Sequence, residues 1–196
     1  MMKKLLWLLP VLAMVAAGSW FLLKPPPMPE PYTGMGGEFT LRSAQGPVSL
    51  SDFRGNLVLI YFGYTSCPDI CPTSLGALSA ALKKLSPEEM AHVQPLFISV
   101  DPERDTSDKL VAYARYFHPK MVGLTGSLEQ LEEIADRYGA YFRKAEVENS
   151  TLGYAVDHSS VIYVVNPKGV LVDMIHHSGS VNAILERIRA ALAQGS

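Results

Sequence analysis

The sequence predicts an α/β domain in which helices cover both faces of a mixed β-sheet, preceded by an N-terminal membrane helix. Two apolar, β-rich runs, residues 57–62 and 96–100, lack the polar alternation of half-exposed strands and fit strands buried on both faces. Each run is followed by a segment with the spacing of an amphipathic helix. Residues 161–165 and 170–175 flank a turn and add an antiparallel hairpin, which makes the sheet mixed.

Residues 1–23 are expected to form a membrane anchor. Two lysines precede an uncharged run, residues 5–23, which Lys24 closes. As a helix this run spans roughly 28 Å, close to the ~30 Å hydrocarbon core of a bilayer, and it is longer than the apolar core of most secretory signals. A signal cleaved near residues 16–18 is the alternative, but the apolar run continues past that point. With the lysines on the cytoplasmic side, the domain lies outside the cytoplasm, in the periplasm or an equivalent compartment.

Residues 24–37 are expected to be a linker, because five prolines and three glycines in this stretch prevent a packed element. The globular domain is expected at residues 38–196, which is long enough to bury a core without a metal or a disulfide. The formal net charge of −2 shows no basic excess, so no nucleic-acid partner is expected.

The other elements follow from local signals. Leucines three and four residues apart predict the helix after the central strand, and Ser127 and Gln130 form a capping-box pair at the start of another. Residues 166–169 form the turn of the later hairpin. In chain order we expect a hairpin at 39–42 and 47–50, the central strand 57–62, a helix at 72–85, the strand 96–100, helices at 107–116 and 127–138, the hairpin at 161–165 and 170–175, and a helix at 180–193.

Cys67 and Cys71 are the two cysteines of the chain, and they lie between the end of the central strand and the start of its helix. This placement makes the predicted fold thioredoxin-like. A helix N-terminus stabilises a thiolate and lowers its pKa. The two sulfurs could form a local disulfide, act as a redox pair, or bind one soft metal ion such as copper(I) or zinc. An inert disulfide explains least, because so short a loop constrains few unfolded conformations.

A third metal donor is sought among the five histidines, because two thiolates leave a copper ion undersupplied. His158 is the best candidate, since it precedes a predicted strand in a loop that would face the cysteines in a thioredoxin-like sheet. A hydrogen-bonded structural histidine is the alternative. His92 and His118 lie in polar connections and are expected to be solvated. His176 and His177 could bind metal, but a surface location is the simpler interpretation.

The domain contains four blocks in this order: SCPDICPTSL, SVDPERDT, FHPKMVGLTG and YAVDHSSVIYVVNPKG. Together they resemble the Sco/SenC copper-delivery proteins of cytochrome c oxidase assembly, from about residue 38 to near the C-terminus. The resemblance implies a membrane-anchored domain that binds one copper ion, as copper(I) or copper(II), through Cys67, Cys71 and His158. It also implies delivery to the dinuclear copper site of cytochrome c oxidase subunit II, with another copper chaperone or a thiol reductase as donor. Residues 144–153 have no distinctive pattern and are expected to be a variable excursion.

Three aspartates could support these ligands. Asp157 could orient His158 or simply form a turn. Asp69 could cap the helix that follows it, which is the preferred interpretation, or face a partner. Asp101, with the charged stretch DPERD that runs from it to Asp105, could lie at the same crevice as the cysteines or in a solvated turn.

Two functions from different classes use the same cysteines. A metallochaperone would bind copper and let a partner exchange the ligands without catalysing a reaction, and this is the favoured hypothesis. A thiol-disulfide oxidoreductase would instead reduce the cysteines of the oxidase site through a mixed disulfide. His158 discriminates between them, because disulfide exchange does not need it as a ligand.

Overall fold

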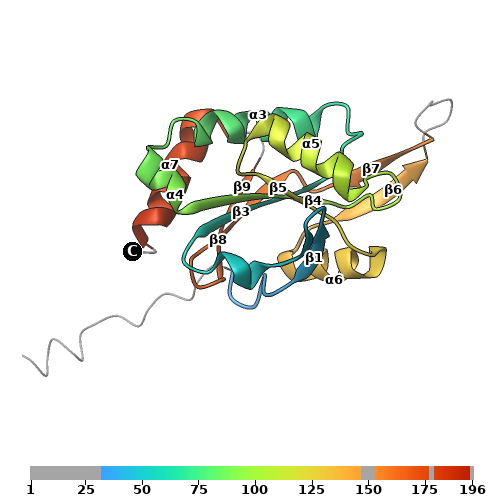
Figure 1. Cartoon of the computed structure of the whole chain (residues 1–196), viewed down its shortest axis with the longest axis horizontal. Coiled ribbons are helices and arrows are strands. Elements are labelled where there is room, and N and C mark those ends of the chain that lie inside the picture. Colours follow the sequence, from blue (N-terminus) through green and yellow to red (C-terminus); the bar gives the residue numbers. More distant parts are fainter. Residues whose placement is uncertain (1–31, 147–152, 177–178, 195–196) are drawn as a thin grey trace, which may run out of the picture. The chain divides into compact units, whose positions relative to one another are not determined.

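The structure is a computed structural model that describes residues 32–146, 153–176 and 179–194. Its centre is a five-stranded sheet in the order β5-β4-β3-β8-β9 (Figure 1). The strands are β3 (Leu57–Gly63), β4 (Val93–Ser99), β5 (Val122–Leu124), β8 (Val161–Val165) and β9 (Leu171–His176). Because β3 pairs in parallel with β4 and antiparallel with β8, the predictions of a mixed sheet and of a central strand at 57–62 are confirmed.

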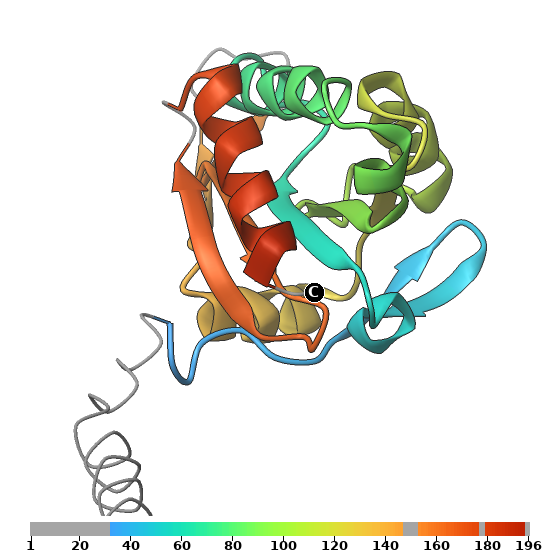
Figure 2. The same cartoon turned by 90° about the vertical axis from the view of Figure 1, so that its left-hand side faces the viewer.

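The two faces of this sheet enclose separate cores. The helices that cover them are α3 (Ile70–Leu82), α5 (Ser107–Phe117), α6 (Leu128–Tyr138) and α7 (Val181–Gln194). Alternate side chains of β3 point to opposite faces, so Tyr61 joins the core with α3, α5 and α7, whereas Phe62 joins the core with α6. Figures 1 and 2 show α3, α5 and α7 on one side of the sheet and α6 on the other. Helices on both faces are therefore confirmed.

The helices match their predicted ranges except α3, which is expected at residues 72–85 and ends at Leu82. The α3 helix starts at Ile70 rather than at residue 72, which places Cys71 in its first turn. The capping box expected for α6 is present: the Gln130 N–H donates to Ser127 Oγ (3.2 Å), and the Ser127 N–H donates to Gln130 Oε1 (2.9 Å). Both α5 and α7 lie within one residue of their predicted ends.

Five short elements are not predicted by the sequence patterns: η1 (Leu50–Phe53), α4 (Pro87–Ala91), β5, β6 (Phe142–Glu146) and β7 (Tyr154–His158). The α4 helix does carry a signal, since Ser86 and Glu89 form a capping box with Pro87 at the first helical position. The β6 strand reads FRKAE, which has no apolar alternation, and its pairing with β7 makes it a strand. These two strands form a hairpin separate from the central sheet. Residues 147–152, inside the expected excursion, lie outside the described residues.

Both predicted hairpins are present. The first pairs β1 (Thr40–Ser43) with β2 (Gly46–Ser49) as a sheet of its own, and the second pairs β8 with β9. In the turn of the second hairpin Gly169 has a φ of 83°, a left-handed conformation that glycine adopts without a steric cost.

The expected membrane helix at residues 1–23 and the linker up to residue 31 lie outside the described residues. Among the residues that are described, no helix combines the length and the apolar character needed to cross a bilayer. The last residues of the expected linker contact the α6 region: the Gly36 N–H donates to the carbonyl of Arg137 (2.7 Å), and the Tyr138 hydroxyl donates to the carbonyl of Gly37 (3.0 Å). The chain therefore enters the domain beside α6.

Candidate metal centre

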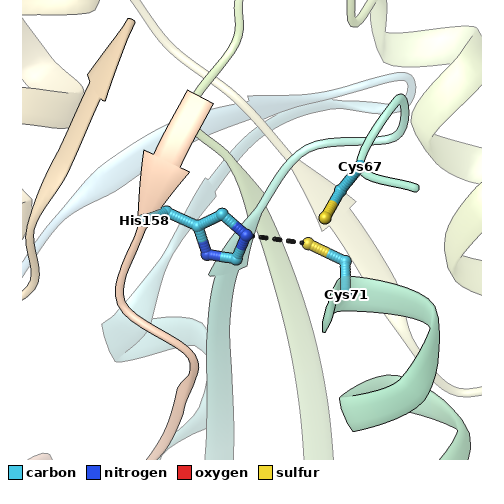
Figure 3. A group of neighbouring side chains, drawn as sticks. All are labelled: Cys67, Cys71 and His158. Carbon is cyan, nitrogen blue, oxygen red and sulfur yellow. Dashed lines mark hydrogen bonds between the residues drawn. The ribbon is translucent and has the colours of Figure 1, made fainter. Parts of the chain in front are cut away.

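Three elements bring two sulfurs and one imidazole together (Figure 3). Cys67 lies in the turn after β3, Cys71 lies in the first turn of α3, and His158 is the last residue of β7. Their ligand atoms all lie within 4.8 Å of one another, and Nε2 of His158 is 3.2 Å from Sγ of Cys71. In Figure 3 the imidazole and both sulfurs point toward a common centre.

Cys71 occupies a closely fitted position in the core. It is 0% exposed, whereas Cys67 is partly exposed. Gly63, the last residue of β3, leaves space for the Cys71 sulfur, because a Cβ there would lie 2.6 Å from Sγ and 3.1 Å from the rings of Phe97 and Tyr61. Real Cβ atoms essentially never come within 3.0 Å of another heavy atom. A larger residue at position 63 must therefore displace the sulfur or the strand.

A buried carboxylate fixes the loop that carries Cys67. Asp105 is 1% exposed and accepts from the backbone N–H of Thr65 (2.9 Å) and from its hydroxyl (2.5 Å). The same carboxylate accepts from the Ser99 hydroxyl at the end of β4 (2.6 Å) and from Lys109 Nζ on α5 (3.1 Å). Because Thr65 precedes Cys67 by two residues, these bonds hold the cysteine loop against β4 and α5. The lysine offsets the buried negative charge.

A cation–π cluster fixes the hairpin that carries His158. The Arg104 guanidinium lies 3.7 Å from the centroid of the Tyr154 ring. It donates to the Tyr154 carbonyl (2.9 Å) and to the Asp101 carboxylate (2.5 Å). The Tyr154 hydroxyl donates to the same carboxylate (2.7 Å). Tyr154 is thus held at both its backbone and its hydroxyl, and it starts the strand that ends at His158.

Strand alternation turns His158 toward the cysteines. Tyr154, Val156 and His158 share one face of β7, whereas Asp157 between them is exposed on the other. Nδ1 of His158 lies 3.1 Å from the carbonyl of Ser159. A carbonyl can only accept, so we assign a proton to Nδ1. Nε2 then faces the sulfurs and is the ring atom that can bind a metal.

The position of His158 corrects the expectation of a loop, because the residue ends a strand. Its proximity to the cysteine loop is as expected. The imidazole meets the rings of Tyr61 and Tyr64 edge to face, with centroids 6.1 and 5.8 Å away. These contacts restrict the ring to the orientation that the Ser159 carbonyl favours.

The two thiols differ in acidity because they share one site. The pKa of Cys67 is lowered to about 3, mainly because the Cys71 thiol donates a hydrogen bond to its thiolate. Burial acts in the opposite direction, and a hydrogen bond from His158 lowers the pKa further. The pKa of Cys71 is raised, because its proton is held by Cys67 and because burial disfavours a second negative charge. The negative charge therefore rests on Cys67, the more exposed of the two residues.

The donor set fits one soft metal ion. Sulfur and nitrogen donors bind such ions at about 2.0–2.3 Å, so two donors of one ion lie roughly 3.3–4 Å apart. The three donors here are separated by between 3.2 and 4.8 Å, so small side-chain shifts suffice. Thiolates select copper(I) or zinc, and imidazole also suits copper(II). The group formed by Cys67, Cys71 and His158 can therefore hold a metal ion.

Two of the candidate aspartates lie at the surface. Asp157 is exposed on the outer face of β7, so strand alternation points its carboxylate away from His158. Asp69 occupies the N-cap position of α3, but its carboxylate accepts from the Thr73 hydroxyl (3.2 Å) and makes no side-chain cap bond to a helix N–H. Asp69 therefore marks the helix start without capping it in the expected way.

Asp101 is 1% exposed, which overturns the alternative of a solvated turn. The sequence places Arg104 and Asp105 in the same charged stretch but does not predict their individual roles. The available signal is the charged block directly after a buried strand, because strand ends of this kind border the crevice in which ligands bind. Tyr61 and Gly63 are also missed, since the sequence marks them only as part of a buried strand.

The other histidines that the structure describes do not belong to the group of metal-ligand atoms. His118 is 9% exposed, which corrects the expectation that it is solvated, and its Nδ1 accepts from the N–H of Lys120 (3.2 Å). His92 and His176 are exposed. His177 lies outside the described residues.

Comparison with known proteins identifies relatives over most of the chain. The family model described as SCO1/SenC matches residues 28–193. The mitochondrial SCO2 homolog of Mus musculus is 43% identical over 159 residues, which are 80% of this chain and 62% of that protein. This chain therefore spans about three fifths of the length of that curated relative.

Solved structures agree with this relationship. Arabidopsis thaliana ScoI with copper bound has a TM-score of 0.76 and 39% identity, covering 82% of this chain and 99% of that one. BsSco, a member of the Sco family of cytochrome c oxidase assembly proteins in which a disulfide switch was identified, has a TM-score of 0.63 and 26% identity, covering 81% and 94%. The thioredoxin-like expectation for the domain is confirmed by these neighbours. The chain belongs to the SCO1/SenC family.

Proposed function

We propose that the protein is a copper metallochaperone that binds one copper ion through Cys67, Cys71 and His158. Its cargo site would serve the assembly of the dinuclear copper site of cytochrome c oxidase subunit II. The observation that carries the proposal is that Nε2 of His158 and the two cysteine sulfurs all lie within 4.8 Å of one another. The copper-bound ScoI relative and the oxidase-assembly role given for BsSco support the same assignment.

The burial of the ligands suits transfer rather than permanent retention. Cys71 is fully buried, whereas Cys67 and His158 are partly exposed and border a surface hollow of ≈ 380 Å³. Ligands of a partner can approach from the side of Cys67 and His158, while the Cys71 sulfur keeps the cargo in place from below. Because the donors already lie close together, little of the binding free energy is used to assemble the site.

The anchor and the cellular side complete the proposal. Residues 1–23 would hold the domain at a membrane, on the side outside the cytoplasm, with residues 24–37 as the linker. Residues 38–196 would be the copper-binding domain. Another copper chaperone would supply the cargo, or a thiol reductase would first return the cysteines to the thiol form that binds metal.

A second function is favoured by one observation, the low pKa of the partly exposed Cys67 beside a second thiol. In this function the Cys67 thiolate attacks a disulfide of subunit II, forming a mixed disulfide and releasing one substrate thiolate. Cys71 then loses its proton and attacks Cys67, which releases the second substrate thiolate. Two electrons pass to the substrate, and a Cys67–Cys71 disulfide remains.

The test uses full-length protein in detergent, prepared with the cysteines reduced or joined as a disulfide. Both forms are titrated with copper and then mixed with metal-free subunit II. The chaperone function predicts one copper per reduced chain, far weaker binding by the oxidised chain, and transfer of copper to the reduced partner. Equal binding by both forms would show that the metal lies elsewhere. Reduction of an oxidised partner without copper transfer would favour the oxidoreductase function.

A further inference from the structure

The buried side of the metal centre contains two hydroxyl groups with no assigned role. Tyr61 in β3 is 0% exposed, and Ser74 in α3 is 2% exposed. Neither hydroxyl has a hydrogen-bond partner among the residues that the structure describes. Buried hydroxyls are nearly always paired, because an unpaired donor in a low-dielectric core carries its full desolvation cost. Both hydroxyls are therefore available to donate when Cys71 becomes a charged acceptor.

Both hydroxyls border Cys71. Ser74 lies one turn along α3 from Cys71, on the same helix face. A Cβ placed on Gly63 would lie 3.1 Å from the Tyr61 ring and 2.6 Å from the Cys71 sulfur, so the ring and the sulfur lie close to the same point. The pKa of Tyr61 is raised, first by burial and then by Cys71, while Ser74 acts in the opposite direction. The Tyr61 hydroxyl is therefore adjacent both to the sulfur and to Ser74.

Cys71 needs a donor once it becomes a metal ligand. A thiol sulfur is a weak acceptor, whereas a thiolate is charged and accepts strongly. The charge of a Cys71 thiolate lies in an apolar core at 0% exposure, away from bulk water. The Tyr61 hydroxyl is in place to donate to this sulfur, and Ser74 can donate to the Tyr61 oxygen in turn.

We propose that Tyr61, supported by Ser74, donates a hydrogen bond to the Cys71 sulfur when that sulfur binds copper, and that this bond favours copper(I) over copper(II). The inference rests on the proposed copper-binding function. The hydrogen bond stabilises the buried thiolate that copper(I) binding requires. By drawing electron density from the sulfur it also weakens donation to copper(II) more than to copper(I), and so raises the reduction potential. Tyr61 thus helps to select the oxidation state of the cargo without being a ligand.

The experiment compares full-length wild type in detergent with Tyr61→Phe and Ser74→Ala. Tyr138→Phe is the matched control, because Tyr138 is also 0% exposed but lies on the opposite face of the sheet, where its hydroxyl donates to a backbone carbonyl. Three quantities are measured for each protein: the thermal midpoint without copper, the copper(I) affinity by competition with a chelator, and the position of the sulfur-to-copper(II) charge-transfer band.

We expect Tyr61→Phe to keep or raise the thermal midpoint without copper, because it removes an unpaired buried hydroxyl. The copper(I) affinity should fall on the order of tenfold, and the charge-transfer band should move to longer wavelength. Ser74→Ala should shift both metal readouts in the same direction by a smaller amount. Tyr138→Phe should lower the thermal midpoint with and without copper and leave the band in place.

An unchanged band and an unchanged copper(I) affinity in Tyr61→Phe would overturn the inference while leaving the copper-binding function intact. A loss of stability without copper that equals the loss with copper would show a merely structural role for Tyr61. If Tyr61→Phe does not fold, Ser74→Ala decides, because unchanged metal readouts in that variant also overturn the inference. Failure of wild type to bind copper would instead contradict the proposed function itself.

Discussion

Nε2 of His158 lies 3.2 Å from Sγ of Cys71, although 87 residues separate them in the chain. Three supports outside the ligand set produce this contact. Gly63 leaves the space that the Cys71 sulfur fills, Asp105 fixes the cysteine loop, and Arg104 fixes the hairpin that ends at His158. Each support can be altered while all three ligands remain in the chain.

Replacement of the histidine separates the two functions. Loss of a group that only supports a metal ligand typically lowers metal affinity by roughly 10–100-fold. His158→Ala removes a ligand itself, so copper(II) affinity should fall by more than this. Disulfide exchange by Cys67 should be largely retained, since it depends on thiolate fraction and access. The measurements are a copper titration and a reaction with a disulfide substrate, with the exposed His92→Ala as control. Equal copper(II) affinity in wild type and His158→Ala would remove His158 from the ligand set.

Enlarging Gly63 should disturb the site from below. In Gly63→Ala the new Cβ lies 2.6 Å from Sγ of Cys71 unless the strand or the sulfur moves. We expect a loss of about 1–3 kcal/mol in the free energy of unfolding, together with weaker copper binding. Denaturant unfolding and copper titration of the same preparations give both quantities.

Gly76→Ala is the matched control for this change. Gly76 lies inside α3, and a Cβ there meets nothing within 4 Å. The substitution should stabilise the protein by about 0.5–1 kcal/mol, because alanine favours a helix interior, and copper binding should not change. If both glycine variants bind copper like wild type, the close fit around Cys71 has no role in the metal centre.

Loss of the cation–π cluster should loosen the His158 hairpin. Two cations lie over the Tyr154 ring, Arg104 at 3.7 Å and Lys144 at 4.7 Å from its centroid. Arg104→Gln removes the nearer one and leaves the buried Asp101 carboxylate without its charged partner, at a cost of about 1–3 kcal/mol in the free energy of unfolding. Hydrogen exchange should become faster in β6 and β7, and copper affinity should fall. Arg143→Gln, which removes an exposed positive charge from β6 of the same hairpin, should have little effect. Unchanged exchange in Arg104→Gln would show that the hairpin is held by other contacts.

A buried histidine away from the metal centre should make stability depend on pH. Burial, and then the charges of Lys120 and Lys83, lower the pKa of His118 in the folded protein. Below its ordinary pKa of 6.5 the unfolded chain takes up a proton that the folded chain resists, so stability is lost as the pH falls through this range. Thermal midpoints at about pH 7.5 and 5.5 should therefore differ more in wild type than in His118→Gln. Equal differences in the two proteins would contradict this assignment.

The sequence was sufficient to predict the layers of the fold because its long apolar runs have one interpretation. Residues 57–62 are apolar without alternation, and the structure pairs β3 on both sides. The β6 strand could not be predicted in this way, since FRKAE becomes a strand only by pairing with β7 across residues 147–152. Contacts of this kind depend on tertiary structure and leave little trace in local propensity.

The ligands could be predicted from residue chemistry, whereas their supports could not. Cysteine and histidine are rare in this chain, so Cys67, Cys71 and His158 attract attention by type. Arg104 and Asp105 resemble ordinary surface charges until burial and hydrogen bonds are known. The alternation that turns Asp157 away from His158 also becomes visible only once residues 154–158 are known to form a strand.

The most direct test of the central claim is X-ray absorption at the copper edge on reduced full-length protein loaded with one equivalent of copper. The account predicts a first shell of two sulfur donors and one imidazole nitrogen. In His158→Ala the two sulfurs should remain and the imidazole scattering should disappear. A shell without sulfur, or imidazole scattering that persists unchanged in His158→Ala, would contradict the assignment of the metal centre to Cys67, Cys71 and His158.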